Sequence, residues 1–375
     1  MIRRGAKVQI TAAVAHGPHQ DFSIETVELS SPRSDEVLVE IRGVGLCHTD
    51  IAARDGIYGL PYPLVLGHEG SGVVVAVGKD VTSVAPGDKV AMSFSSCGTC
   101  RPCAAGRPAY CTTFAQENYI GSRPDGTETM LANGSPVHAN FFGQSSFATH
   151  VLVTERNTVK VDTGLDIALV GPLGCGIQTG AGAVMKSMNC VKESSLVVLG
   201  GGPVGLAAVM GAVIQGCSTI IVVEPVENRR TTATRLGATH VIDPISENVT
   251  HRIMEITADG IDYIFDTTGR TEVITAAIDA AAQNATVGLV GVPADFSVNL
   301  PLNIVGAMQK GLTVRGIVEG DSRPQSFIPE LLGYHAAGRF PFDSIITTYP
   351  FSKINDAVAA QERGEVTKLV LVPDA

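Results

Sequence analysis

The sequence contains no tryptophan, is poor in aromatic residues (5%) and has fewer basic than acidic side chains. Its 27 lysine and arginine residues face 37 aspartate and glutamate residues, which gives a formal net charge of -10 at pH 7. Nucleic acid and anionic membranes are therefore unexpected partners, because both are bound through clustered basic side chains. The length of 375 residues predicts roughly two domains with large hydrophobic cores.

Long hydrophobic runs are also scarce. Residues 196–216 are about as long and as free of charge as a membrane-spanning helix, but glycines and a proline divide them into a short strand and a helix. Cysteines at metal-ligand spacing are typical of a reducing compartment. The sequence therefore predicts a cytoplasmic protein.

Six of the eight cysteines fall in two arrangements that are typical of metal ligands. Cys97, Cys100, Cys103 and Cys111 form a C-x2-C-x2-C-x7-C run in a polar loop. Four thiolates close a tetrahedral zinc site, which is structural because no coordination position stays open. An iron–sulfur site also uses C-x2-C-x2-C spacing and remains the alternative.

The second arrangement predicts an open metal site. Cys47 and Cys175 lie far apart in the sequence, and His68 lies between them in a glycine-rich turn with Glu69 beside it. Two thiolates and one imidazole leave the fourth zinc position free, as in catalytic sites. Asp50 is placed to accept the other imidazole N–H of His68. Any one of these residues alone is more often structural, but together they favour a catalytic zinc.

From about residue 176 the pattern alternates between strands and helices, which predicts βαβ units and a parallel sheet. The expected strands are 195–199, 219–224, 239–242, 261–266, 285–291 and 312–318, and the expected helices are 204–215, 227–236, 247–257 and 271–282. The first 165 residues read as short β segments, such as 36–42 and 72–78, and predict a small barrel-like β domain. Residues 113–146 read as a long surface loop, and the last 55 residues as helix, strand and helix returning to the first domain.

A glycine fingerprint follows the strand at 195–199. The G-x-G-x-x-G pattern lies between that strand and a helix, which is the context that dinucleotide binding requires; its residues are Gly200, Gly202, Pro203, Val204 and Gly205. Glu224 ends the next strand, where a carboxylate bonds both ribose hydroxyls and repels a 2′-phosphate. NAD is therefore expected, although Arg229 and Arg230 weaken the preference over NADP. A solvated strand-end acid is the alternative for Glu224.

In this order, the motifs resemble the zinc-dependent medium-chain dehydrogenase/reductase family of the alcohol dehydrogenase type. The resemblance is carried by Cys47-His48-Thr49-Asp50, Gly67-His68-Glu69-Gly70-Ser71-Gly72, the four-cysteine loop, Gly143-Gln144-Ser145-Ser146-Phe147-Ala148 and the fingerprint. Residues 171–182 are most similar to the aryl-alcohol (benzyl-alcohol) dehydrogenase branch. The resemblance implies an α/β fold with a GroES-like β-rich catalytic domain (1–175, with 318–375 returning to it) and a Rossmann-type doubly wound parallel-sheet cofactor domain (176–317).

The resemblance also implies an activity. It is the reversible, zinc- and NAD-dependent oxidation of primary aromatic or allylic alcohols to aldehydes, with aliphatic, terpenoid or thiol-adduct (formaldehyde) alcohols as the alternative. A zinc-free quinone reductase is disfavoured, because all the expected zinc ligands are present. A homodimer or homotetramer is implied, with strand 312–318 at a subunit contact.

The roles of several residues follow from the same resemblance. Thr49 takes the alcohol proton, Glu69 approaches the metal during ligand exchange, and His48 and Lys368 fall where the family binds the pyrophosphate. Ala52 departs from the family, which has a proton-relay histidine five residues after the first zinc cysteine. We hypothesise that His48 or water replaces this histidine, or that proton release is slow. Phe94 is expected near the pocket, where an aromatic wall favours a flat apolar substrate, although an ordinary packed phenylalanine fits equally well.

Overall fold

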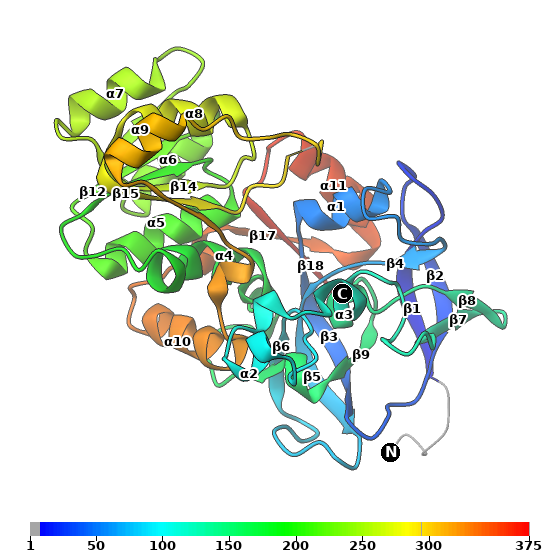
Figure 1. The fold of residues 1–375 in the computed structure, drawn as a ribbon. Coiled ribbons are helices and arrows are strands. Elements are labelled where there is room, and N and C mark those ends of the chain that lie inside the picture. Colours follow the sequence, from blue (N-terminus) through cyan, green and yellow to red (C-terminus); the bar gives the residue numbers. More distant parts are fainter. Residues whose placement is uncertain (1–7, 294, 375) are drawn as a thin grey trace. The chain divides into compact units, whose positions relative to one another are not determined.

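The computed structural model describes residues 8–293 and 295–374. The chain divides into two compact units, which are coloured along the sequence in Figure 1. The first unit comprises Met1–Cys175, Arg323–Ala336 and Ile346–Ala375, and the second comprises Gly176–Ser322 and Ala337–Ile345. The assignment of catalysis to one unit and of dinucleotide binding to the other remains a prediction.

The second unit is built on a six-stranded parallel sheet. Its strands are β11 (Ser195–Leu199), β12 (Thr219–Val223), β13 (His240–Ile242), β14 (Ile261–Asp266), β15 (Ala281–Leu289) and β16 (Thr313–Gly316). They lie in the order β13-β12-β11-β14-β15-β16, so the order reverses beside β11. This doubly wound arrangement places a ligand-binding switch point at the carboxyl end of β11 and confirms the predicted Rossmann-type fold.

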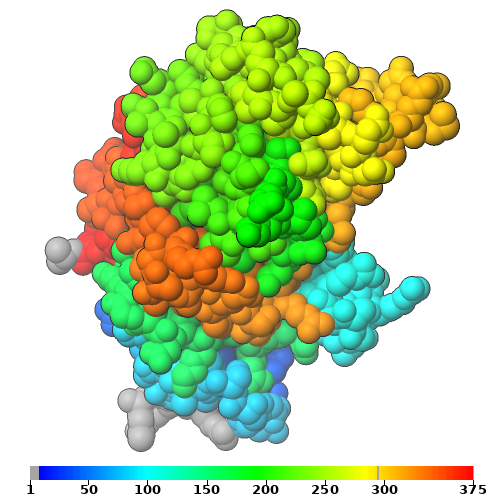
Figure 2. Space-filling model, turned by 90° about the vertical axis from the view of Figure 1, so that its left-hand side faces the viewer, coloured from blue at the N-terminus to red at the C-terminus, as the bar shows by residue number. Residues whose placement is uncertain are grey.

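Helices connect these strands, as the alternating pattern predicted. They are α5 (Pro203–Gln215), α6 (Glu227–Arg235), α7 (Val249–Ile256), α8 (Thr271–Asp279) and α9 (Ile304–Lys310), and a further helix, α4 (Gly176–Gly182), precedes β11. The sequence did not predict α9, because every side chain of this helix is at least partly exposed and no buried apolar stripe marks it. Its ends are fixed by Asn303, whose side chain accepts a hydrogen bond from Gly306, and by Gly311 in the left-handed conformation. Residues near 300 lie on the surface of the unit (Figure 2).

The first unit is β-rich, as predicted. One sheet has the order β4-β1-β2-β7-β8, with bounds Leu64–Val65, Val8–Ala15, Ser23–Leu29, Met130–Ala132 and Ser135–Val137. The other has the order β10-β6-β5-β3-β18-β17, with bounds Thr158–Lys160, Lys89–Met92, Glu69–Val77, Glu36–Leu46, Lys368–Val372 and Ile346–Pro350, and β9 (His150–Thr154) also pairs with β3. All these pairs are antiparallel except β17 with β18.

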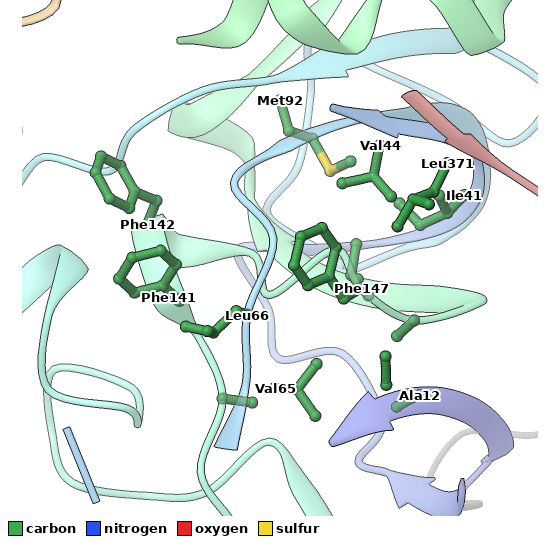
Figure 3. Close-up of a cluster of buried hydrophobic side chains, with 14 of the residues drawn as sticks. Ala12, Ile41, Val44, Val65, Leu66, Met92, Phe141, Phe142, Phe147 and Leu371 are labelled. Carbon is green, nitrogen blue, oxygen red and sulfur yellow. The ribbon is translucent and has the colours of Figure 1, made fainter. Parts of the chain in front are cut away.

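The core of the first unit joins segments that are distant in the sequence. Phe147 is fully buried among side chains that include Ile41, Val44 and Leu371 (Figure 3). Leu371 lies on β18, which pairs with β3, so the end of the chain completes this core. Of the C-terminal segment, α10 (Pro324–Ala336), β17, α11 (Ile354–Glu362) and β18 belong to the first unit, whereas residues 318–322 and Ala337–Ile345 belong to the second. The additional strand β18 corrects the expectation of helix, strand and helix alone.

The expectation of a long surface loop at 113–146 is wrong. The segment contains α3 (Phe114–Asn118), β7 and β8, and the side chains of Phe141 and Phe142 are buried. The buried Asn118 side chain joins it to the core, since its amide donates to the Ser95 carbonyl (3.0 Å) and its oxygen accepts from the Ser95 N–H (2.8 Å). Elements this short give no periodicity, so polar and glycine-rich composition dominated the prediction.

Within the described residues, no single helix has both the length and the apolar composition to cross a membrane. The helical segments Ile167–Gly174 and Gly176–Ser187 reach that length and composition only as a pair with a sharp bend between them.

Candidate active site and metal centres

The imidazole of His68 is oriented by a buried carboxylate. Asp50 lies in the first turn of α1 (His48–Arg54), and its Oδ1 accepts hydrogen bonds from His68 Nδ1 (2.8 Å) and from the Gly67 N–H (3.0 Å). Its Oδ2 accepts a hydrogen bond from the Cys47 N–H (3.0 Å). Both Asp50 and His68 are fully buried. The predicted role of Asp50 is confirmed: it holds the proton on Nδ1, so the lone pair of His68 resides on Nε2.

The turn at Gly67 is as tight as the sequence suggested. Its φ is +89°, and a Cβ at this position would lie 2.5 Å from the Phe147 backbone nitrogen. A side chain is therefore excluded, and the strand β5 begins two residues later at Glu69. Local backbone geometry thus places His68 and Glu69 next to each other at the start of the strand.

Four donor side chains meet at this point. The ligand atoms of Cys47, His68, Glu69 and Cys175 all lie within 4.8 Å of one another. Within the described part of the chain, the buried Nε2 of His68 has no hydrogen-bond partner. A hydrogen bond from Cys175, opposed by burial, lowers the pKa of the Cys47 thiol well below its ordinary value. Thiolates and an imidazole lone pair that converge in this way are the donor set that zinc prefers, so the residues fit a zinc ion.

Glu69 has a cationic partner. The Lys368 ammonium, at the start of β18, pairs with the Glu69 carboxylate and donates a hydrogen bond to the Leu46 carbonyl (3.1 Å). Burial alone would lower the pKa of Lys368, but the charge of Glu69 raises it above its ordinary value. Lys368 is only 2% exposed, so the structure shows it as the partner of Glu69. Its pyrophosphate role stays a prediction.

The remaining residues of the first motif lie on α1. Thr49 Oγ1 lies 3.7 Å from Cys47 Sγ, so its hydroxyl borders the metal ligands. His48 is exposed, whereas Ala52, one turn further along the same helix, is buried. Residues four apart share a helix face, so His48 lies on the face where the family's relay histidine would stand.

Sequence reasoning missed an aromatic wall beside the metal ligands. The Phe142 ring stacks on the His68 imidazole at 4.4 Å, and Tyr119 meets Phe142 edge-on at 5.2 Å and stacks on Tyr58 at 5.1 Å. Burial and the nearby charges of Cys47, Cys175 and Asp50 raise the pKa of Tyr58, and the Thr49 side chain opposes this shift. The adjacent phenylalanines 141 and 142 were the available signal, and the loop assignment obscured it. Phe94 belongs to the same aromatic group, since its ring lies 5.8 Å from that of Phe114.

The four-cysteine loop forms a second, separate cluster. The sulfur atoms of Cys97, Cys100, Cys103 and Cys111 all lie within 4.8 Å of one another. Burial raises the pKa of the Cys97 thiol, but hydrogen bonds from the backbone N–H groups of Thr99 and Cys100 outweigh burial and lower this pKa to about 5. Four convergent thiols with amide donors around them fit a closed zinc site, because four thiolates fill the coordination positions of a tetrahedral zinc ion.

The glycine fingerprint occupies the predicted position in the second unit. Gly202 caps α5, Pro203 is its first residue, and Val204 follows. A Cβ on Gly205 would lie 1.9 Å from the Gly200 carbonyl oxygen, so only glycine at position 205 lets the helix lie this close to the loop. The first turn of α5 follows the carboxyl end of β11 directly after the glycine loop, which is where a pyrophosphate binds in this fold.

Glu224 follows β12 and is 3% exposed. Its carboxylate accepts hydrogen bonds from the Gly201 N–H (2.6 Å) and the Val226 N–H (2.9 Å), so the alternative of a solvated strand-end acid is wrong. Arg230 bonds the carbonyls of Glu224 (2.8 Å) and Pro225 (2.7 Å). Arg229 lies 3.9 Å from the Glu224 carboxylate.

Known proteins share both the sequence and the fold. Residues 33–163 match the family described as "Alcohol dehydrogenase GroES-like domain", and residues 203–333 match "Zinc-binding dehydrogenase". The chain is 46% identical to the geraniol dehydrogenase of Castellaniella defragrans over 97% of this chain and 98% of the relative. Its fold is similar to that of benzyl alcohol dehydrogenase from Acinetobacter calcoaceticus, with a TM-score of 0.95 and 39% sequence identity over 98% of this chain and 100% of that structure. It is also similar to that of an alcohol dehydrogenase zinc-binding domain protein from Burkholderia ambifaria, with a TM-score of 0.97 and 45% identity over 99% of this chain and 100% of that structure.

These matches cover both units and both metal clusters. A β-rich GroES-like unit carries the Cys/His/Glu site and the four-cysteine site, and a Rossmann-type unit carries the fingerprint. The chain belongs to the zinc-dependent alcohol dehydrogenases of the medium-chain dehydrogenase/reductase family.

Proposed function

We propose that this enzyme uses NAD to oxidise primary aromatic or allylic alcohols reversibly to aldehydes. The observation that carries the substrate class is the stacking of Phe142 on His68, continued by Tyr119 and Tyr58. Flat, polarisable faces beside the reacting centre favour a substrate whose hydroxyl-bearing carbon is attached to a ring or a double bond. The relatives named for geraniol and benzyl alcohol support the same class.

Cys47, His68 and Cys175 would hold the catalytic zinc, with Glu69 within reach. When bound, zinc supplies a Lewis acid that lowers the pKa of the substrate hydroxyl. Asp50 keeps His68 Nε2 directed at the metal position, and the Lys368 ammonium holds Glu69 by charge. Thr49 is positioned to accept the substrate proton, since its Oγ1 lies 3.7 Å from Cys47 Sγ. The four-cysteine loop would hold a structural zinc.

The cofactor proposal depends on Glu224. Its buried carboxylate lies at the carboxyl end of β12, beside the fingerprint glycines, where it would bond the ribose hydroxyls and repel a 2′-phosphate. Arg230 is occupied by backbone carbonyls and by Asp243, which leaves Arg229 as the nearby cation. NAD, which supplies a hydride acceptor when bound, is therefore favoured over NADP.

We also infer a cytoplasmic homo-oligomer. Strand β16 is an edge strand whose four residues are all exposed. Exposed large apolar side chains lie on this strand (Val314), on the preceding helix α9 (Ile304, Val305 and Met308) and just after the strand (Val318). An exposed apolar edge of a sheet favours pairing with a second copy. Light scattering of the purified enzyme tests this proposal, and a monomer would contradict it.

The substrate proposal is tested by kcat/KM for benzyl alcohol, geraniol and ethanol with NAD and with NADP. We expect benzyl alcohol and geraniol to exceed ethanol strongly with NAD, and a zinc chelator to abolish all three activities. Tyr58→Leu removes one ring of the wall and should lower kcat/KM for the unsaturated alcohols by roughly 2- to 10-fold, with a smaller effect on ethanol. Tyr349→Leu, a half-buried ring on β17, is the matched control.

Equal turnover of ethanol by the unmodified enzyme would contradict the substrate class. It would favour the aliphatic alternative with the same zinc chemistry, whereas activity towards none of the three alcohols would favour another terpenoid or a thiol-adduct (formaldehyde) substrate.

A further inference from the structure

Two cysteines lie outside both metal clusters, in the second unit. Cys190 lies just after the helical segment Ala183–Ser187, and Cys217 follows the last turn of α5. Both are free thiols. Neither contributes to the site or to the fingerprint described above, so their proximity needs its own explanation.

Backbone hydrogen bonds bring the two segments together. The Glu193 N–H donates to the Gly216 carbonyl (2.8 Å), and the Ser218 N–H donates to the Ser194 carbonyl (2.9 Å). The Gln215 side-chain amide donates to the Cys190 carbonyl (3.0 Å). These contacts bring Cys190 and Cys217 next to each other, close enough for each thiol to shift the pKa of the other.

The two sulfur atoms have different surroundings. Cys190 is 2% exposed, and its hydrogen bond to Cys217 together with burial raises its pKa. Cys217 is half-buried and has a second polar neighbour, the Ser194 hydroxyl, at 3.6 Å. The hydrogen bond from Cys190 lowers the pKa of Cys217 to about 7, with a further contribution from Ser194, while burial and the charge of Asp262 oppose it. Cys217 is thus the more nucleophilic thiol at neutral pH, and Cys190 is the protonated thiol next to it.

We propose that Cys190 and Cys217 form an oxidation site at which a hydroperoxide produces an intramolecular disulfide. The Cys217 thiolate attacks the O–O bond, so an S–O bond forms and the leaving oxygen takes a proton as water or an alcohol. The Cys190 sulfur then attacks the Cys217 sulfur; the S–S bond forms, the S–O bond breaks, and the Cys190 proton leaves with hydroxide as water. The two thiols lose two electrons, and the hydroperoxide gains them.

The bridge would enclose a functional part of the second unit. The residues between Cys190 and Cys217 include β11, the glycine fingerprint and all of α5. A disulfide here would therefore close a covalent loop around the proposed pyrophosphate-binding segment, without involving any zinc ligand.

Peptide mapping of the zinc-loaded full-length enzyme tests the proposal. Trypsin cleaves after Lys186, Lys192 and Arg229, so Cys190 and Cys217 fall on two separate peptides that contain no other cysteine. We expect hydrogen peroxide to link peptide 187–192 to peptide 193–229, at doses that release no zinc, and a dithiol reductant to separate them. The proposal is overturned if the two peptides stay separate at doses that already release zinc.

Two variants assign the steps. In Cys190→Ala we expect Cys217 to stop as a sulfenic acid that a 1,3-dione traps. Without its hydrogen-bond donor, Cys217 should also react with iodoacetamide about threefold more slowly at pH 7, because the loss of thiolate exceeds the gain in nucleophilicity. In Cys217→Ala, Cys190 should remain reduced at the same dose; oxidation of Cys190 at the unmodified rate would overturn the assigned order. If either variant fails to fold, mapping of the unmodified enzyme still decides the central point.

Discussion

Asp50→Asn isolates the contribution of the carboxylate that orients His68. The carboxylate accepts three hydrogen bonds, from His68 Nδ1 at 2.8 Å and from the N–H groups of Gly67 and Cys47 at 3.0 Å each. The single side-chain oxygen of an asparagine can replace only one of the two carboxylate oxygens. The NH2 group of the asparagine would therefore either face an N–H donor or rotate away from it. Because the position is fully buried, water cannot compensate for the lost acceptor.

The expected effect is confined to one metal site. Loss of a charge-assisted acceptor costs roughly 1.5–3 kcal/mol, and loss of a carboxylate behind a zinc-bound histidine lowers metal affinity about 10- to 100-fold. Titration with a chromophoric chelator should therefore remove one zinc from the variant at much lower chelator concentration than from the unmodified enzyme. The second zinc, in the four-cysteine loop, provides the internal reference. Zinc affinities within about twofold of the unmodified enzyme at both sites would refute this account of Asp50.

Three further predictions concern proton transfer, cofactor choice and pH stability. The variant Ala52→His places an imidazole one turn from His48 on α1. If proton release limits turnover, kcat should rise and its pH profile should shift. An unchanged kcat and pH profile would show that the proton relay is not limiting. Glu224→Gln removes the charge that bonds Gly201 and Val226, and the ratio of kcat/KM for NAD to that for NADP should fall about tenfold or more; an unchanged ratio would contradict the role of Glu224 in cofactor choice. Burial lowers the pKa of His150, so protonation of this histidine is less favourable in the folded state than in the unfolded state, and stability should fall as pH decreases below about 6.5. The variant His150→Gln should flatten the decline of Tm between about pH 7 and pH 5. An equal decline of Tm in both proteins would exclude His150 as a source of the pH dependence.

The sequence predicted the parallel sheet best because its signals are local and repeated. Strand β11 and strand β14 have the bounds expected from their apolar runs, and the fingerprint lies where strand and helix meet. The metal ligands could also be predicted, since cysteine and histidine carry their chemistry in their identity. The relation of Cys47 to Cys175 is long-range, yet the donor set indicated it.

The aromatic wall could not be predicted in the same way. Phe142 reaches His68 from a segment of short helical turns, in a backbone conformation with φ +53° that no periodic pattern indicates. The strand β18 was missed because it follows the end of α11 after a short connection and was read with the preceding helix. For Lys368 the sequence analysis predicted only a role in pyrophosphate binding and not the ion pair with Glu69. Glu69 lies almost 300 residues earlier in the chain, and local sequence patterns do not indicate an ion pair between residues so far apart.

The most direct test of the account measures zinc and activity together in the unmodified enzyme and in two variants. The unmodified enzyme should hold about two zinc ions per chain. His68→Ala should hold about one zinc ion and lose turnover of benzyl alcohol and geraniol, while Cys100→Ala should lose the other ion and mainly lower Tm. Two zinc ions with undiminished kcat in His68→Ala would contradict the central claim that Cys47, His68 and Cys175 hold the metal that activates the alcohol.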